Sequence, residues 1–121
     1  MPPKRIPSET GRAAVDAALE GSRTDLPTAV RFLLQVLAEG AEGNTVEVRV
    51  PPFGAVQAIQ GPRHTRGTPP NVIEMDAQTW LALATGSLSW ADATASGRVS
   101  ASGQRADLTA YLPVLWGTIE G

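Results

Sequence analysis

Hydrophobic and polar positions follow a helical period over the first third of the chain. Alanine-rich residues 9–19 predict a first helix, which Gly21 can end. Residues 25–39 predict a second, clearer helix, in which the polar positions recur every three or four residues and so form one narrow stripe. These positions are Thr28, Arg31, Gln35 and Glu39.

The second predicted helix is apolar nearly everywhere outside that stripe. Its apolar arc is wider than the arc that a surface helix normally carries. The pattern allows two interpretations. Either the helix is buried between a sheet and other helices, or it packs on a sheet and also borders a cavity.

Residues 46–50 change to a period of two. Three valines alternate with Glu47 and Arg49, which predicts a strand with one buried face and one wet face. The prolines and glycine of residues 51–54 must break this strand, and residues 55–60 predict a second one. Because a parallel return needs a dozen residues or more, so short a link predicts an antiparallel hairpin.

The second half of the chain alternates short strands with short helices. Residues 72–75 predict a third strand, after which Asp76 caps a helix that ends at Gly86. Ser89 then begins a capping-box pattern for another short helix. Residues 98–102 alternate again and predict a fourth strand.

The order of these elements predicts an α+β fold. Helices precede a hairpin, two helices separate the third strand from the fourth, and a last short helix is predicted over residues 107–112. We therefore expect a mainly antiparallel sheet of four to five strands, covered on one face by helices. The prolines and adjacent cations of residues 1–8 predict a disordered tail, and residues 9–121 suit one domain.

Composition narrows the classes of function. The net charge of −2 gives no electrostatic footprint for nucleic acid. The chain has no cysteine and one histidine, so we expect neither a metal site nor another cofactor. No apolar stretch is long enough to cross a bilayer or to act as a signal peptide, and a cytoplasmic location is expected.

The loop between the second and third predicted strands concentrates polar side chains. The candidates are Arg63, His64, Thr65, Arg66, Thr68 and Asn71. The arginines suit forked bonds to a carboxylate or phosphate, which predicts a pocket for an anion or a protein partner. Alternatively, they bond internal carbonyls and carboxylates and fix the loop. Nothing in the sequence places a nucleophile beside His64, so no catalytic role is predicted.

Three tryptophans and an apolar C-terminal stretch are candidates for packing or for a pocket. Trp80 and Trp90 lie on the two consecutive short helices, and Trp116 lies in the stretch. All three suit core packing. Four residues of the stretch also suit a lid over an apolar pocket: Leu112, Val114, Leu115 and Trp116.

Several runs of residues point to one family. Residues 72–86 (VIEMDAQTWLALATG) place a strand before an acidic cap, a short helix with an aromatic–leucine pair and a glycine. Residues 88–93 (LSWADA) and 97–103 (GRVSASG) follow as a helix and a closing strand. Together these runs resemble the sterol carrier protein family. Residues 48–57 (VRVPPFGAVQ) and 64–71 (HTRGTPPN) resemble its small bacterial branch.

The resemblance implies a helix-covered sheet with an apolar tunnel for a sterol, fatty acid or phospholipid. We therefore predict a lipid- or sterol-binding module of the carrier type, not an enzyme, with a pocket between sheet and helices. The residues predicted to line the pocket are Phe32, Leu33, Val36, Trp80, Leu83, Leu112 and Leu115. The alternative is a domain that binds an anion or a protein partner through residues 63–71, without lipid transfer.

Overall fold

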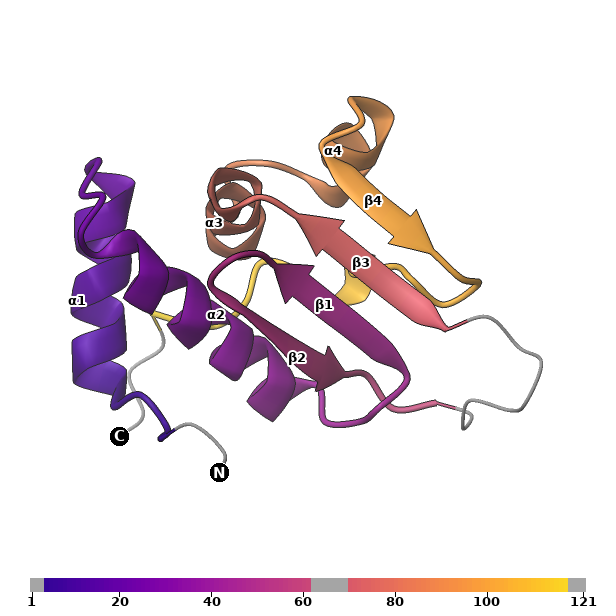
Figure 1. Cartoon of the computed structure of the whole chain (residues 1–121), viewed down its shortest axis with the longest axis horizontal. Helices are drawn as coiled ribbons and strands as arrows, with labels where there is room; N and C mark the ends of the chain where they lie inside the picture. Colours follow the sequence, from indigo (N-terminus) through magenta and orange to yellow (C-terminus); the bar gives the residue numbers. More distant parts are fainter. Residues whose placement is uncertain (1–3, 62–69, 118–121) are drawn as a thin grey trace.

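The strands form one open sheet, and the helices pack on one side of it (Figure 1). The computed structural model describes residues 4–61 and 70–117. The elements within these residues are α1 (Ser8–Leu19), α2 (Leu26–Gly40), β1 (Val46–Val50), β2 (Gly54–Ala58), β3 (Asn71–Met75), α3 (Ala77–Thr85), α4 (Trp90–Ala95), β4 (Val99–Ser102) and the 3-10 helix η1 (Thr109–Tyr111). The α+β class expected from the sequence is confirmed.

The sheet is mixed, with strand order β2-β1-β3-β4. β1 pairs antiparallel with β2, and β3 pairs antiparallel with β4, but the neighbours β1 and β3 are parallel. The parallel pair arises because the chain reverses direction between β1 and β2 and again between β2 and β3. β3 then lies beside β1 and not beside β2. The sheet is thus mainly antiparallel, with one parallel pairing that the sequence pattern does not predict.

The alternation predicted for residues 46–50 gives the sheet a buried face and a wet face. Val48 and Ile73 lie opposite each other on the inner face and are completely buried. Arg49 lies on the outer face, where its guanidinium is 2.9 Å from a Glu47 carboxylate oxygen and 3.9 Å from one of Glu74. All three charged side chains are partly solvated, so this network adds little stability.

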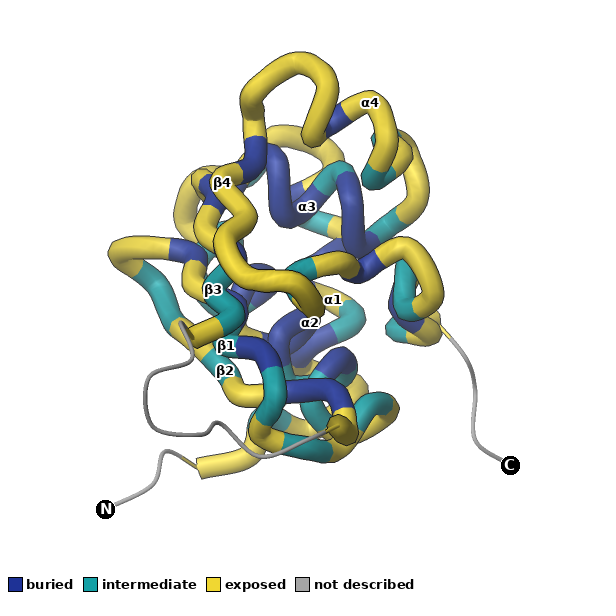
Figure 2. The backbone as a smooth tube through the Cα atoms, turned by 90° about the vertical axis from the view of Figure 1, so that its right-hand side faces the viewer, coloured by how far each residue is buried: buried dark blue, intermediate teal, exposed yellow. Residues whose placement is uncertain are grey.

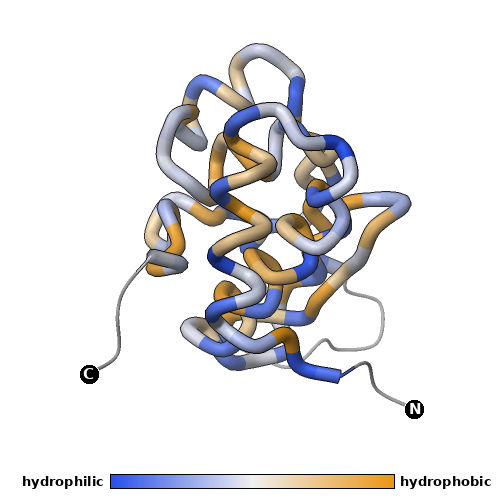
Figure 3. Tube along the Cα trace, turned by 90° about the vertical axis from the view of Figure 1, so that its left-hand side faces the viewer, coloured by the Kyte–Doolittle hydropathy of each residue, from blue (hydrophilic) through white to orange (hydrophobic). Residues whose placement is uncertain are grey.

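The helices form two layers on the inner side of the sheet. α2 packs against α1, β2 and α3, and α1 lies on the side of α2 that faces away from the strands (Figure 1). Buried residues concentrate between the strands and α2 and α3 (Figure 2). Seen from the side of α1, hydrophilic and hydrophobic residues alternate along the trace, as expected for an amphipathic outer helix (Figure 3).

The predicted helix caps after β3 are present. The Asp76 carboxylate accepts a hydrogen bond from the Thr79 backbone N–H at 2.8 Å, and this bond lowers the pKa of Asp76 below its usual range. The Ser89 hydroxyl likewise accepts from the Asp92 N–H at 3.1 Å. α3 ends at Gly86, whose φ of 94° is left-handed and favours glycine.

The segment before α1 lies against α2. Of the tail predicted over residues 1–8, residues 1–3 lie outside the described part of the chain. Arg5 donates two hydrogen bonds to Glu39, at 2.6 and 2.9 Å. The Gln35 side chain accepts from the Ile6 N–H at 2.8 Å and donates to the Ile6 carbonyl at 2.9 Å. These polar positions of α2 therefore bind the chain that enters α1.

Candidate functional site

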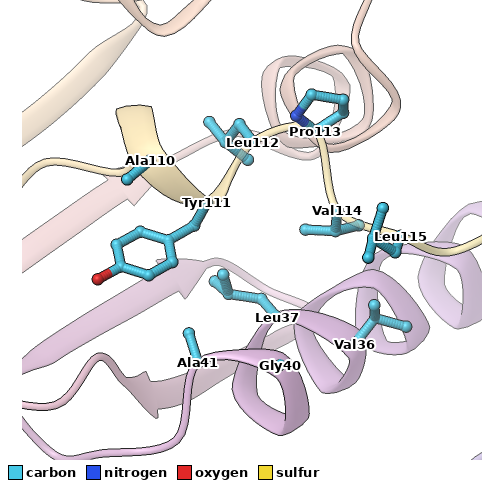
Figure 4. A pocket seen from close by; sticks show the side chains of 10 residues that line it. All are labelled: Val36, Leu37, Gly40, Ala41, Ala110, Tyr111, Leu112, Pro113, Val114 and Leu115. Atoms are coloured by element: carbon cyan, nitrogen blue, oxygen red, sulfur yellow. The ribbon is translucent and has the colours of Figure 1, made fainter.

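An open cleft lies between the C-terminal half of α2 and residues 110–115 (Figure 4). Its volume is about 330 Å³. One wall comes from α2 and the residue that follows it, and the other comes from the segment that begins within η1. The lining residues are Val36, Leu37, Gly40, Ala41, Ala110, Tyr111, Leu112, Pro113, Val114 and Leu115.

The α2 wall is fixed by hydrogen bonds at the end of the helix. The Ala41 N–H donates to the Leu37 carbonyl at 2.9 Å, and the Ala41 carbonyl accepts from the Ile59 N–H at 2.6 Å. The Ile59 carbonyl in turn accepts from the Thr45 N–H at 3.1 Å. Ile59 has a φ of 72°, which is strained for a β-branched residue, so it needs such bonds to hold it. They tie the end of α2 to the end of β2.

The opposite wall is anchored at two points. Leu108 is completely buried, and its carbonyl accepts a hydrogen bond from the Tyr111 N–H at 2.9 Å. Val114 is also buried, and its N–H donates to the Ala84 carbonyl of α3 at 3.0 Å. Just beyond the second anchor, Leu115 is 77% exposed at the cleft. The wall is thus held at its ends and presents uncovered apolar surface beside the opening.

The lining of the cleft is uncharged. Tyr111 supplies the only polar side-chain atom among the ten lining residues, and its hydroxyl lies at the end of the cleft away from Leu115 (Figure 4). Leu37 is buried and Val36 is half-buried, so the α2 wall is firmly packed from behind. The side chains of this lining offer apolar contact and one hydroxyl group, and they favour ligands with a large apolar surface.

The structure separates the residues predicted for the pocket into two groups. Those that line the cleft are Val36, Leu112 and Leu115. Those that lie in the closed core are Phe32, Leu33, Trp80 and Leu83. Trp80 is completely buried, and its indole N–H donates to the Val30 carbonyl at 3.3 Å. The cleft therefore lies between α2 and the C-terminal segment, and not between the sheet and the helices.

Sequence reasoning missed the small residues at the end of α2. Gly40 and Ala41 leave room for the cleft because neither carries a long side chain. Their signal in the sequence is a pair of small residues directly after an apolar helix. Within the proposed lid, Leu112, Val114 and Leu115 do line the cleft, whereas Trp116 is half-buried against the core.

The polar loop predicted to bind an anion lies largely outside the described residues. This holds for Arg63, His64, Thr65, Arg66 and Thr68. Asn71 is described, and its side-chain amide donates to the Thr45 carbonyl at 3.0 Å. Its side-chain oxygen accepts from the Arg105 N–H at 2.9 Å. Asn71 thus ties the start of β3 to neighbouring loops, and binding of an anion or partner by the loop stays a prediction.

Asp107, like Asp76, has a lowered pKa because of neighbouring residues in its own turn. The hydroxyl and the N–H of Thr109 donate hydrogen bonds to the Asp107 carboxylate at 2.6 and 2.8 Å and lower its pKa.

Residues 4–61 and 70–117 contain no cluster of three histidine, aspartate or glutamate side chains that could hold a metal ion. In the same stretches, no helix has the length and apolar character needed to cross a membrane.

The fold and the cleft define a helix-covered α+β domain with an apolar recess beside its second helix. Residues 22–114 match the protein family described as "Bacterial SCP ortholog", where SCP stands for sterol carrier protein. The match covers most of the chain and both walls of the cleft as far as Val114. The chain belongs to this family, and the resemblance seen in the sequence is confirmed. No curated protein matches the chain.

Proposed function

We propose that this protein is a carrier-type module that binds the apolar part of a lipid or similar small molecule in the cleft. The observation that carries the proposal is an uncharged lining around a volume of about 330 Å³. This volume is near the lower end of the range of about 300–1,000 Å³ found for ligand pockets. Membership of a sterol carrier protein-like family supports the same class of ligand.

The binding energy would come from apolar surface removed from water. Each 100 Å² of apolar ligand surface contributes about 2.5 kcal/mol, before the costs of association are subtracted. A small, open cleft covers only part of a lipid, so the affinity expected is modest. Modest affinity suits a carrier, because a carried molecule must also be released.

The proposal includes no catalytic step. The described acidic residues with a lowered pKa are Glu39, Asp76 and Asp107, and none is part of the cleft lining. Glu39 is held by Arg5, and the other two are held by their own helix or turn. Tyr111 alone in the lining offers a proton, and it has no acid or base beside it in that set. Proton transfer needs partners within hydrogen-bond reach.

The cytoplasmic location expected from the sequence stays a prediction.

The test begins with the lipid content of freshly purified protein. Native mass spectrometry would show a bound ligand, and organic extraction would identify its class. We expect bound lipid at no more than one molecule per chain, and a higher melting temperature when this lipid is added back to stripped protein. If nothing co-purifies and no fatty acid, alcohol, phospholipid or sterol raises the melting temperature, the proposal is wrong.

A variant in which the cleft is filled by a larger side chain tests whether the ligand binds in the cleft. The Ala41 side chain points toward the opposite wall (Figure 4), so Ala41→Phe places a ring in the space that a ligand would occupy. Ala13→Phe makes the same chemical change at an exposed position of α1 and serves as the control. We expect Ala41→Phe to abolish lipid retention and Ala13→Phe to preserve it. Equal retention by both variants would locate the lipid elsewhere.

A further inference from the structure

The charges around the cleft are unevenly distributed. No lysine, arginine or histidine contributes to the lining. The charged residues nearest in sequence to the α2 wall are Glu39 and Glu42, which precede Gly40 and follow Ala41 and are both exposed. Two carboxylates therefore flank the end of the α2 wall in the sequence.

The two glutamates differ in their partners. Glu39 is paired with Arg5, whose hydrogen bonds and positive charge hold the pKa of Glu39 below its usual range. Glu42 has no hydrogen bond or ion pair with any other described residue. Its negative charge is thus uncompensated by the parts of the chain that the structure describes, next to a residue that lines the cleft.

An ionised ligand headgroup would meet unfavourable conditions in this cleft. Removing a charge from water costs free energy unless a partner of opposite charge or several hydrogen bonds replace the water. Among the side chains of the lining, only Tyr111 offers a hydrogen-bonding group, and none carries a positive charge. A carboxylate would also be repelled by Glu42. A neutral hydroxyl or ester can exchange a hydrogen bond with the Tyr111 hydroxyl, which both donates and accepts.

We infer that the cleft selects apolar ligands whose polar end is uncharged, such as long-chain alcohols and esters, over fatty acid anions of the same length. This inference rests on the proposed binding function and specifies its ligand class. The selectivity exists only if the polar end of the ligand lies within the cleft. A headgroup that remained in bulk water would contribute equally in the alcohol and in the acid.

The experiment uses four ligands with the same twelve-carbon chain: dodecanol, methyl dodecanoate, dodecanoate and dodecylammonium. Affinities are measured by calorimetry or by tryptophan fluorescence, at pH 8 and low salt. We expect the alcohol and the ester to bind at least about tenfold more tightly than dodecanoate, and the ammonium ion to fall between them, because its charge is also desolvated but is attracted by Glu42.

Charge reversal at Glu42 tests the cause. Glu42→Lys should raise the affinity for dodecanoate about three- to fivefold and leave the affinity for dodecanol unchanged, which is the range expected for an exposed charge pair. Glu20→Lys makes the same change at the end of α1 away from the cleft and should alter neither affinity. An unchanged dodecanoate affinity in Glu42→Lys would overturn the role of Glu42.

The outcomes separate this inference from the proposed function. If dodecanol and dodecanoate bind the wild-type protein equally well and Ala41→Phe weakens both, the carrier function stands and the selectivity is wrong. If none of the four ligands binds and no phospholipid or sterol raises the melting temperature, the proposed function itself fails. Tighter binding of the neutral ligands, lost in Ala41→Phe, supports both.

Discussion

The same helix, α2, borders two apolar regions that differ in how they are filled. On the side of α1 and α3, Leu33 and Phe32 lie with Trp80 in a closed core. On the side of residues 110–115, the helix borders an open cleft. The first side meets regular helices whose side chains interlock. The second meets an extended segment held at its ends, so apolar surface alone does not decide whether a region closes.

The largest expected effects contrast two leucines, one from each region. Leu33→Ala should lower the free energy of unfolding by about 2–5 kcal/mol, because it leaves a cavity in a closed core. Leu115→Ala removes the same atoms from a side chain that is 77% exposed, and should change stability by less than about 0.5 kcal/mol. Urea denaturation of both variants gives the comparison.

Leu115→Ala should nevertheless weaken ligand binding, because its side chain lines the cleft. A loss of stability in Leu115→Ala that equalled the loss in Leu33→Ala would show that the C-terminal segment is part of the core. The distinction between the two regions would then disappear.

Two glycines in helices allow the same comparison, with smaller expected changes in the free energy of unfolding. A Cβ atom at Gly11 would overlap the ring of Phe32, whereas a Cβ atom at Gly40 would meet nothing within 4 Å. Gly11→Ala should therefore destabilise the protein by about 1–3 kcal/mol through overpacking. Gly40→Ala should be neutral or stabilise it by up to about 0.5 kcal/mol, since alanine restricts the unfolded chain. Thermal denaturation distinguishes the two, and a stable Gly11→Ala variant would mean that α1 shifts easily on α2.

The smallest effect concerns the cap of α3, which carries Trp80 into the core. The pKa of Asp76 is lowered in the folded state, so its carboxylate stabilises the fold above the unfolded pKa of about 3.9. This contribution is lost as the pH falls through the lower, folded pKa. Asp76→Asn keeps a capping group but removes the charge, and should cost about 0.5 kcal/mol at pH 7.

The stability difference between wild type and Asp76→Asn should shrink as the pH falls from 7 to 2, as measured by urea denaturation at both pH values. A difference that is the same at both pH values would mean that the charge of Asp76 has no part in the cap.

Features encoded by neighbouring residues could be predicted from the sequence, and features that depend on distant segments could not. The cap at Asp76, the left-handed Gly86 and the alternation through Glu47 and Arg49 each depend on a few adjacent residues. The parallel pairing of β1 with β3 depends on strand order. The sequence alone also cannot tell which apolar residues of α2 lie in the core and which border the cleft. Leu33 and Val36 are both apolar, and their different burial depends on the distant segments that pack against them.

Because β1 lies between β2 and β3 in the sheet, the length of the connection from β2 to β3 can vary. Because β3 pairs with β1 and β4, a hairpin turn does not fix the length of this connection. In general, the chain entropy lost on closing a loop grows only with the logarithm of its length, so that a doubling in length costs about 0.6 kcal/mol. Insertions into this connection that leave Ile59 and its hydrogen bonds to Ala41 and Thr45 unchanged should therefore be tolerated by the fold.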